Sequence, residues 1–337
     1  MNNINMREWL NALKTNGQKK SMPMLSFPCV QLLGCTVKEL ISSSDMQAKG
    51  MKLVADAVPS LASVSLMDLS VEAECFGSEI IFSEDEVPTV TGAIVSDIDD
   101  ANALRVPEVG EKRSGLYIDS IKKAKALITD RPVFAGVIGS FSLAGRLVDV
   151  TEALVYCYTD PDLLHIVLDK CTTFLINYIT EYKKAGANGV VIAEPLAGLL
   201  SPDLAAEFSE TYIKKIVDAT QDDNFLVIYH NCGNTAIQII DSILRTGSAA
   251  YHFGNAIDMK EMMEHIPADT VAMGNIDPAG QFKNGTVESI KAVTKELLSE
   301  CGKYDNFVIS SGCDIPPMAS WDNIHAYFDA IDEFYKD

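Results

Sequence analysis

Three residues of types that bind soft metal ions follow short apolar runs of the chain. His230 and Cys232 come directly after Phe225–Tyr229, and Cys313 comes shortly after Phe307–Ser310. Side chains two residues apart on an extended strand point to the same side, so His230 and Cys232 can present an imidazole and a thiolate to one point. Cys313 can supply a third ligand there. Three protein ligands with one open position are typical of a catalytic zinc site, whereas structural sites use four.

A zinc ion held in this way would favour chemistry on sulfur. Zinc keeps a coordinated thiol deprotonated near neutral pH, and two protein thiolates on the metal leave the bound sulfur electron-rich and reactive. Neutral histidine ligands suit the activation of water instead. Nucleotide deaminases also use one His and two Cys, but their P-C-x-x-C and H-x-E motifs do not occur in this sequence. We therefore predict a zinc site that activates a substrate thiol.

Carboxylate and imidazole groups follow other apolar runs of the sequence. Glu194 comes two residues after Gly189–Ile192, and it could be a fourth zinc ligand displaced by the substrate, a base for the thiol, or a carboxylate that caps a loop. Asp277 is predicted to contact substrate or order its loop, with a turn-forming Asp-Pro as the alternative. His252 stands near the end of Ala249–Phe253 and is predicted to contact substrate or a partner.

The composition excludes several classes of partner. Lys and Arg total 27 against 47 for Asp and Glu, and the net charge of −20 argues against binding to nucleic acid or to an anionic membrane. No apolar stretch is long enough to span a bilayer, and the first six residues have no signal-peptide pattern, so we expect a cytoplasmic protein. Eight cysteines without any C-x-x-C are expected to be free thiols in a reducing compartment.

Strand-like and helical segments alternate along most of the chain, which predicts a parallel sheet. The predicted strands are Pro23–Phe27, Ser63–Met67, Val133–Ile138, Gly189–Ile192, Phe225–Tyr229, Ala249–Phe253, Thr270–Met273 and Phe307–Ser310. The predicted helices are Pro161–Lys184, Pro202–Ala219, Thr235–Thr246, Met259–Ile266 and Thr286–Cys301. A β-hairpin excursion is expected between residues 72 and 98.

Eight strands in one unbroken chain favour a single (β/α)8 TIM barrel over residues 1–337, with the N-terminal hairpin outside it. A doubly wound sheet is the alternative, but no G-x-G-x-x-G follows a strand. In a barrel the C-terminal ends of the strands meet at one mouth, where active sites lie. The three candidate zinc ligands stand at strand ends, and so do Glu194, Asp277 and His252. All six residues are therefore predicted to share that mouth.

Five motifs resemble one protein superfamily over nearly the whole length of the chain. They are Val71–Gly77 with the later Val87-Pro88, Gly136–Gly145, His230–Gly233, Gly274–Pro278, and Gly312–Pro316 with Asn323 following. The chain resembles the uroporphyrinogen decarboxylase superfamily, and within it the methylcobamide:coenzyme M methyltransferase branch. The H-x-C pair and the distant Gly-Cys are the motifs specific to this branch.

The resemblance implies a zinc ion held by His230, Cys232 and Cys313. It further implies that a methyl group passes from a methylated corrinoid, carried on a separate corrinoid protein, to a small thiol bound on the zinc. Asn275 and Asp314, together with His252, are then expected to contact the substrate or the corrinoid.

Two departures from the methyltransferase pattern concern the acceptor. His252 stands where a small or polar residue is more common, and Asp314 follows the zinc cysteine where a small residue is usual. Coenzyme M, homocysteine and tetrahydrofolate therefore stay open as acceptors. The decarboxylase branch is the other alternative, but residues 23–31 contain no arginine to hold the carboxylates of a porphyrinogen.

Overall fold

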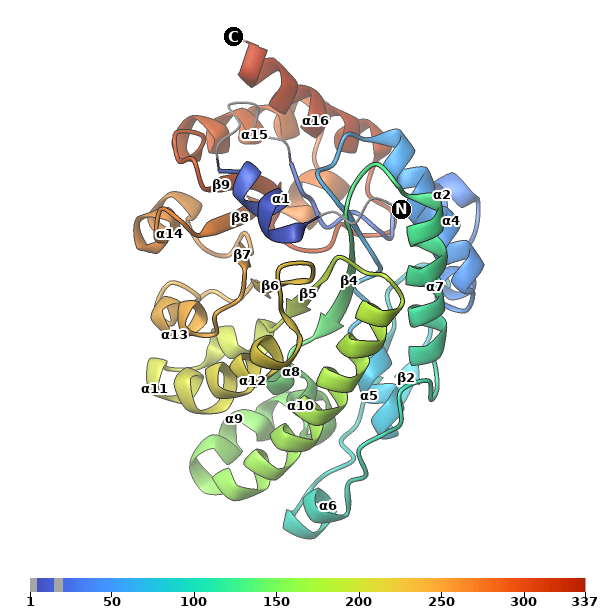
Figure 1. Cartoon of the computed structure of the whole chain (residues 1–337), viewed down its shortest axis with the longest axis vertical. Helices are drawn as coiled ribbons and strands as arrows, with labels where there is room; N and C mark the ends of the chain where they lie inside the picture. Colours follow the sequence, from blue (N-terminus) through green and yellow to red (C-terminus); the bar gives the residue numbers. More distant parts are fainter. Residues whose placement is uncertain (1–4, 15–20, 337) are drawn as a thin grey trace.

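A curled parallel sheet forms the centre of the computed structural model, which describes residues 5–14 and 21–336 (Figure 1). In these residues its strands are β1 (Ser63–Val64), β4 (Val133–Ile138), β5 (Gly189–Ala193), β6 (Leu226–Asn231), β7 (Ala250–Phe253), β8 (Val271–Ile276) and β9 (Phe307–Ser311). They pair in the order β1-β4-β5-β6-β7-β8-β9, and every pairing is parallel. The predicted parallel α/β architecture is thus confirmed.

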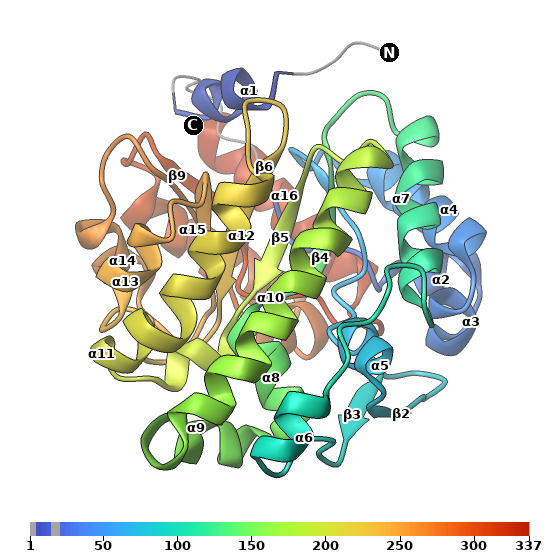
Figure 2. The ribbon, with the colours of Figure 1, turned by 60° about the horizontal axis from the view of Figure 1, so that its bottom comes forward.

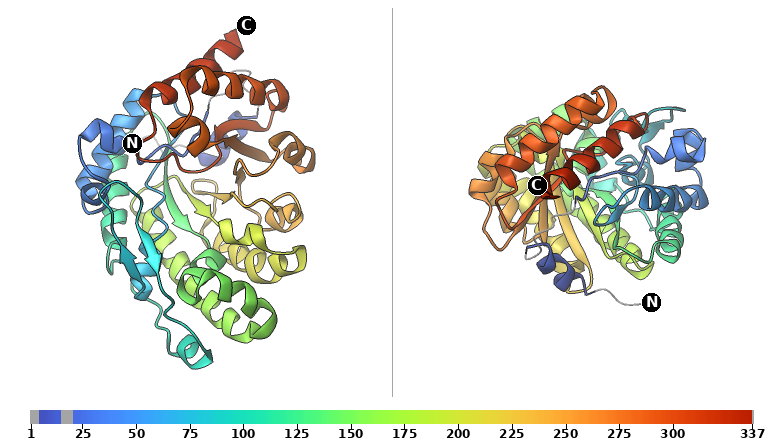
Figure 3. Two further views of the ribbon diagram at one scale, coloured as in Figure 1. Left: turned by 180° about the vertical axis from the view of Figure 1, so that it is seen from behind. Right: turned by 90° about the horizontal axis from the view of Figure 1, so that it is seen from above.

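Helices surround the sheet and connect successive strands (Figure 3). The longer ones are α4 (Ser44–Ala57), α7 (Ser114–Leu127), α8 (Ser140–Val148), α9 (Val150–Thr159), α10 (Pro161–Lys184), α12 (Thr211–Thr220), α15 (Val287–Cys301) and α16 (Trp321–Lys336). The shorter ones are α1 (Met6–Ala12), α2 (Cys29–Leu33), α3 (Val37–Ile41), α5 (Val71–Phe76), α6 (Ile98–Ala103), α11 (Pro202–Ala205), α13 (Ile240–Arg245) and α14 (Met259–His265), with single irregular turns η1 (Pro195–Leu199), η2 (Ala206–Glu210) and η3 (Pro278–Lys283). Among the helices described, none combines the length and apolarity that a membrane span requires.

The two edges of the sheet meet at an extended segment near the N-terminus. The Met22 N–H donates to the carbonyl of Ile309 on β9 at 3.2 Å, and the Leu61 N–H, just before β1, donates to the Ser21 carbonyl at 2.8 Å. The eighth strand predicted at Pro23–Phe27 is not formed, because Pro23 has no N–H and the segment makes too few ladder bonds. The described sheet therefore has seven strands, with this segment lying between its edges.

The interior of the curled sheet is filled by side chains from alternate positions of the strands. Phe134, Val191, Ile228, Met273 and Val308 are among those packed there, all 2% exposed or less. Side chains alternate between the two faces of a strand, so every second position of β6, β7 and β9 points inward up to the C-terminal end of each strand. Those positions carry polar residues at the C-terminal end of the interior.

Helix α1 packs against the opposite end of the sheet. Its Met6 and Leu10 belong to the interior apolar cluster, and the ring of Trp9 lies 5.9 Å from that of Phe134. Arg7 pairs with Asp223, just before β6. Figure 2 shows α1 at one end of the molecule and α6, α8 and α9 at the other.

Outside the main sheet, β2 (Glu79–Ile81) and β3 (Thr89–Thr91) form a two-stranded antiparallel sheet in the region where a hairpin excursion is expected. Two predicted helices differ from the structure. The Pro202–Ala219 segment is interrupted by the wide turn η2, and α13 begins only at Ile240 because Thr235 binds the Gly198 carbonyl through its hydroxyl instead of entering the helix.

Candidate metal centre

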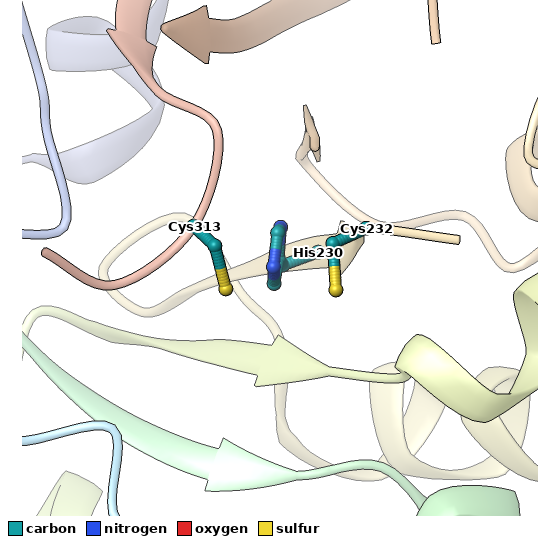
Figure 4. A group of neighbouring side chains, drawn as sticks. All are labelled: His230, Cys232 and Cys313. Carbon is teal, nitrogen blue, oxygen red and sulfur yellow. The ribbon is translucent and has the colours of Figure 1, made fainter. Parts of the chain in front are cut away.

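His230, Cys232 and Cys313 come together at the C-terminal end of the sheet. His230 lies on β6, Cys232 lies just beyond its last residue, and Cys313 lies two residues beyond the end of β9. Their ligand atoms are all within 4.8 Å of one another, and Figure 4 shows the imidazole between the two sulfur atoms. Cys232 and Cys313, 81 positions apart in the sequence, are thus neighbours because parallel strands end at the same edge.

The geometry and the chemistry of these three residues fit one zinc ion. Two ligands with bonds of about 2.3 Å can stand at most about 4.6 Å apart, so small side-chain shifts suffice for shared coordination. The Nε2 atom of His230 is buried and has no hydrogen-bond partner. A buried nitrogen left without a partner is costly unless a ligand occupies its lone pair. One imidazole and two thiols are also ligands that zinc prefers.

Cys232 and Cys313 shift each other's pKa in opposite directions. A hydrogen bond from the Cys313 thiol lowers the pKa of Cys232 well below the ordinary value of a thiol, although burial opposes this, and His230 lowers it further. Cys313 donates that hydrogen bond, which together with burial raises its own pKa. Zinc binds cysteine in its deprotonated form, so thiol protons would leave when the cation binds.

Close backbone contacts fix the loops that carry the cysteines. A Cβ atom on Gly254, which follows β7, would lie 2.5 Å from the Cα and Cβ of Cys232, so only glycine leaves room there. Gly198 and Gly233 approach each other equally closely, since a Cβ on either would lie within 2.6 Å of the other's Cα. The Asn231 side chain accepts from the Gly233 N–H at 2.8 Å and donates to the Glu194 carbonyl at 2.8 Å. Asn231 belongs to no metal-binding pattern in the sequence, although its neighbours His230 and Cys232 on either side do.

Glu194 is fully buried and is bound to the start of helix α8. Its two carboxylate oxygens accept hydrogen bonds from the Phe141 N–H at 3.0 Å and the Ser142 N–H at 2.6 Å. Burial raises the pKa of this carboxyl to about 7, while the bonds from Ser142 and Phe141 act in the opposite direction. Among the described residues the close group of ligand atoms consists of His230, Cys232 and Cys313, and Glu194 is outside it.

His252 lies behind His230, inside the sheet. Its ring is 2% exposed, and its Nδ1 lies 2.9 Å from Nδ1 of His230 while its Nε2 lies 2.8 Å from the hydroxyl of Ser310. Both ring nitrogens thus bind within the protein. The predicted contact of His252 with substrate or a partner stays a prediction. Ser310 was not identified from the sequence, although its inward position on β9, two residues after Val308, was readable from the alternation of the strand.

Asn275 and Asp277 line a cavity of about 300 Å³ beside η3 and α15. The Asn275 amide donates to the carbonyls of Gly254 and Ile257 at 3.0 and 2.9 Å, and it thereby holds the loop after β7. The Asp277 carboxylate accepts from the N–H groups of Ala279 and Gly280 at the start of η3. These contacts order loops at the mouth, and the predicted roles in substrate binding and catalysis stay predictions.

Asp314 follows Cys313 and accepts a hydrogen bond from the Ser26 hydroxyl at 3.3 Å. Burial raises the pKa of its carboxyl well above the usual range, and repulsion from Asp68 adds to this. Asp68 itself pairs with Arg113 and accepts from the Tyr117 hydroxyl at 2.6 Å. The buried charged residues Asp314, Asp68 and Arg113 come from three separate segments, so no single motif in the sequence indicates this group.

Comparison with known proteins finds methyltransferase and decarboxylase relatives. The methylcobamide:CoM methyltransferases MtbA of Methanosarcina acetivorans and Methanosarcina mazei are 27% and 28% identical to the chain, each over 76% of it and 75% of that protein. The uroporphyrinogen decarboxylase of Flavobacterium johnsoniae is 26% identical over 81% of the chain and 80% of that protein.

Two solved structures have the same fold. A methyltransferase from Methanosarcina mazei covers 98% of both chains with a TM-score of 0.86 and 27% identity. A B12-independent methionine synthase from Shewanella sp. W3-18-1 covers 95% of this chain and 96% of its own with a TM-score of 0.63 and 12% identity. The model of the family described as "Uroporphyrinogen decarboxylase (URO-D)" matches residues 23–334. The chain therefore belongs to the uroporphyrinogen decarboxylase family.

Proposed function

We propose that this protein is a zinc-dependent methyltransferase that moves a methyl group from a methylated corrinoid, carried on a corrinoid protein, to a thiol such as coenzyme M. The observation that carries the proposal is the convergence of His230, Cys232 and Cys313 within 4.8 Å, with the His230 Nε2 atom buried and unpartnered. Of the residues described, three supply close ligand atoms, which leaves a coordination position for the acceptor.

The protein residues would bind and orient the acceptor sulfur. When bound, zinc would hold the acceptor as a thiolate at neutral pH. His230, Cys232 and Cys313 would fix the position of that sulfur at the mouth, and the thiol proton would be released as the sulfur binds. The sulfur would then form a bond to the methyl carbon as the cobalt–carbon bond breaks, with both electrons of that bond remaining on the cobalt.

The distribution of arginine supports methyl transfer over decarboxylation of a porphyrinogen. A porphyrinogen with several carboxylates calls for guanidinium groups that are free to bind them. Most arginines of this chain already pair with a carboxylate of the protein: Arg7 with Asp223, Arg105 with Glu111, Arg113 with Asp68 and Glu74, Arg131 with Asp130, and Arg245 with Glu210. The MtbA relatives described above carry methylcobamide and CoM in their names, which also favours this branch.

Zinc content and methyl transfer test the proposal together. Purified protein is expected to contain about one zinc per chain by elemental analysis. It is then mixed with methylcobalamin and with coenzyme M or homocysteine, and the loss of the methylcobalamin absorbance is followed against a sample without enzyme. We expect thiol-dependent demethylation with one of the two acceptors.

Two results would overturn the proposal. One is folded protein that binds no zinc even when zinc is supplied. The other is zinc-loaded protein that demethylates methylcobalamin with neither thiol. Decarboxylation of uroporphyrinogen that survives removal of metal would instead support the other branch of the family.

A further inference from the structure

A second histidine and a serine extend the candidate metal centre into the interior of the sheet. His230 and His252 are register partners on the neighbouring strands β6 and β7, so their side chains point to the same side. Ser310 projects inward from β9. All three are 2% exposed or less, and their polar atoms are joined in one chain of hydrogen bonds.

The direction of this chain is set at its far end. The Ser310 hydroxyl lies 2.7 Å from the Met22 carbonyl, which can only accept, so the single hydroxyl proton of Ser310 is used there. The Ser310 oxygen must then accept from the Nε2 atom of His252, 2.8 Å away. His252 therefore carries its proton on Nε2.

The position of the proton on His252 in turn determines which nitrogen of His230 is free. A neutral His252 with its proton on Nε2 has a bare lone pair on Nδ1, and that atom lies 2.9 Å from Nδ1 of His230. His230 must donate here, so its proton is on Nδ1. The His252 carbonyl, 3.3 Å from the same Nδ1, is a second acceptor on that side. The lone pair of His230 is then on Nε2, the buried atom that has no partner in the protein.

A doubly protonated His252 would reverse this arrangement. It would donate to His230 from Nδ1 and place the remaining proton of His230 on Nε2, where it would face the sulfur atoms. That state buries a cation whose ring hydrogen bonds go to His230 and Ser310, with no carboxylate among them. Burying a charge without an opposite charge is strongly unfavourable, so the neutral ring is the stable one.

We propose that His252 is a positioning residue: with Ser310, it holds His230 in the tautomer and orientation that direct Nε2 at the metal. The proposal rests on the zinc-dependent function proposed above. Partners of this kind commonly change metal affinity by about 10- to 100-fold, and carboxylates or carbonyls usually fill the role. Here a neutral imidazole and a hydroxyl do so, which leaves the charge of the site to the two cysteines.

The tautomers can be read directly in the metal-free wild-type protein. Long-range ¹H–¹⁵N NMR of ¹⁵N-histidine-labelled protein, assigned by single substitutions, distinguishes Nδ1–H from Nε2–H rings. We expect Nδ1–H for His230 and Nε2–H for His252. The opposite tautomer for either ring would overturn the proposal. This measurement needs neither zinc nor turnover, so it succeeds or fails separately from the methyltransferase assignment.

Substitutions test the effect on the metal. His252→Phe keeps a ring but removes both nitrogen atoms, and it is expected to weaken zinc binding at least 10-fold in competition with a chromophoric chelator. Ser310→Ala should weaken binding in the same direction but less, and His252→Gln, whose amide can accept from His230, should recover part of the affinity. His265→Phe, the same change at an exposed histidine of α14, is the control and should bind zinc as the wild type does.

Cobalt-substituted protein adds a spectroscopic measurement, because the visible bands of Co²⁺ report the ligand set. His252→Phe should alter these bands while far-ultraviolet circular dichroism stays unchanged. A folded His252→Phe protein with wild-type zinc affinity and wild-type cobalt bands would overturn the proposal. If that variant does not fold, Ser310→Ala and the wild-type tautomers decide the question.

Discussion

The carboxylate of Glu194 accepts a 2.6 Å hydrogen bond from the backbone N–H of Ser142. This bond links Glu194, just past β5, to the first turn of α8. The second carboxylate oxygen binds the neighbouring N–H of Phe141. A carboxylate at the N-terminus of a helix also interacts favourably with the helix dipole. These contacts use both oxygens of the one carboxylate that was considered as a fourth zinc ligand.

The role of Glu194 can be tested by separating stability from metal binding. Glu194→Ala leaves two buried N–H groups without acceptors, and we expect it to lower the free energy of unfolding by about 1–3 kcal/mol. Zinc content should stay at about one per chain. Denaturant unfolding and elemental analysis of the same preparation check both points. Loss of zinc from a folded Glu194→Ala protein would show that the carboxylate belongs to the metal site.

Cys232 and Cys313 should each be necessary for zinc. Cys232→Ala and Cys313→Ala remove a thiolate from a three-residue site, and each is expected to lose zinc and thiol-dependent demethylation together. Cys35→Ala is the matched control because Cys35 is also free and partly buried but lies elsewhere. Zinc retained in both Cys232→Ala and Cys313→Ala would place the metal at another site.

Removal of the metal should be reversible. Dialysis against a strong chelator is expected to abolish demethylation of methylcobalamin, and one equivalent of zinc should restore it. Magnesium should not restore activity, because thiolate and imidazole ligands bind it poorly. The recovered rate as a function of added zinc gives the stoichiometry, and full activity in zinc-free protein would contradict the prediction.

Glu72 should make stability depend on pH. Its side chain is 1% exposed, one oxygen accepts from the Ile138 N–H at 3.1 Å, and the other has no partner. Burial raises the pKa of this carboxyl from 4.5 to about 8. Between those values the folded protein keeps a proton that the unfolded chain loses, so stability falls as pH rises. At about 1.4 kcal/mol per pKa unit, the effect is at most about 5 kcal/mol.

The measurement is the difference in unfolding free energy between wild type and Glu72→Gln across about pH 5 to 8. Glutamine cannot ionise, so the variant should lose stability less steeply than the wild type as pH rises. Glu79→Gln, at an exposed position on β2, is the control and should follow the wild-type slope. Parallel curves for wild type and Glu72→Gln would show that Glu72 does not hold its proton in the folded state.

The packing of Gly254 against Cys232 gives a steric prediction. In Gly254→Ala the new Cβ would lie 2.5 Å from the Cα and Cβ of Cys232, so one of the two loops must move. We expect weaker zinc binding in a protein that still folds, because the shift displaces a ligand from the strand end. Chelator competition and circular dichroism check this. Unchanged zinc affinity would mean that the loop after β6 adapts without moving its sulfur.

Much of the fold was predictable because the parallel strands are buried on both faces and appear as continuous apolar runs. The strand Val133–Ile138 and the helix Pro161–Lys184 were predicted with the bounds they have in the structure. The conformation of the N-terminal segment was not predictable. An extended piece that bonds to each edge of a sheet only once or twice leaves no periodic pattern in the sequence. The interruption of the helix after Pro202 by a wide turn likewise has no marker of Gly or Pro in the sequence.

The convergence of the three candidate metal ligands was predictable for a different reason. An H-x-C pair on a strand and a cysteine just past another strand need only the two-residue period of a strand and the common edge of a parallel sheet to be brought together. The contacts of His252 and Glu194 were not predictable, because they depend on which neighbouring strand or helix lies opposite each side chain. Ser310 had no recognisable motif at all and was identified only through its hydrogen bonds.

Helix α1, which packs Met6, Leu10 and Trp9 against the end of the sheet opposite the cysteines, also has a kinetic consequence. With that end filled, both reactants of the proposed transfer would have to enter from the end that carries the cysteines. A corrinoid docked at that end would cover the position where the thiol binds. If the proposed transfer takes place there, we expect the thiol to bind first and the methylated product to leave last, an ordered mechanism that product-inhibition patterns would test.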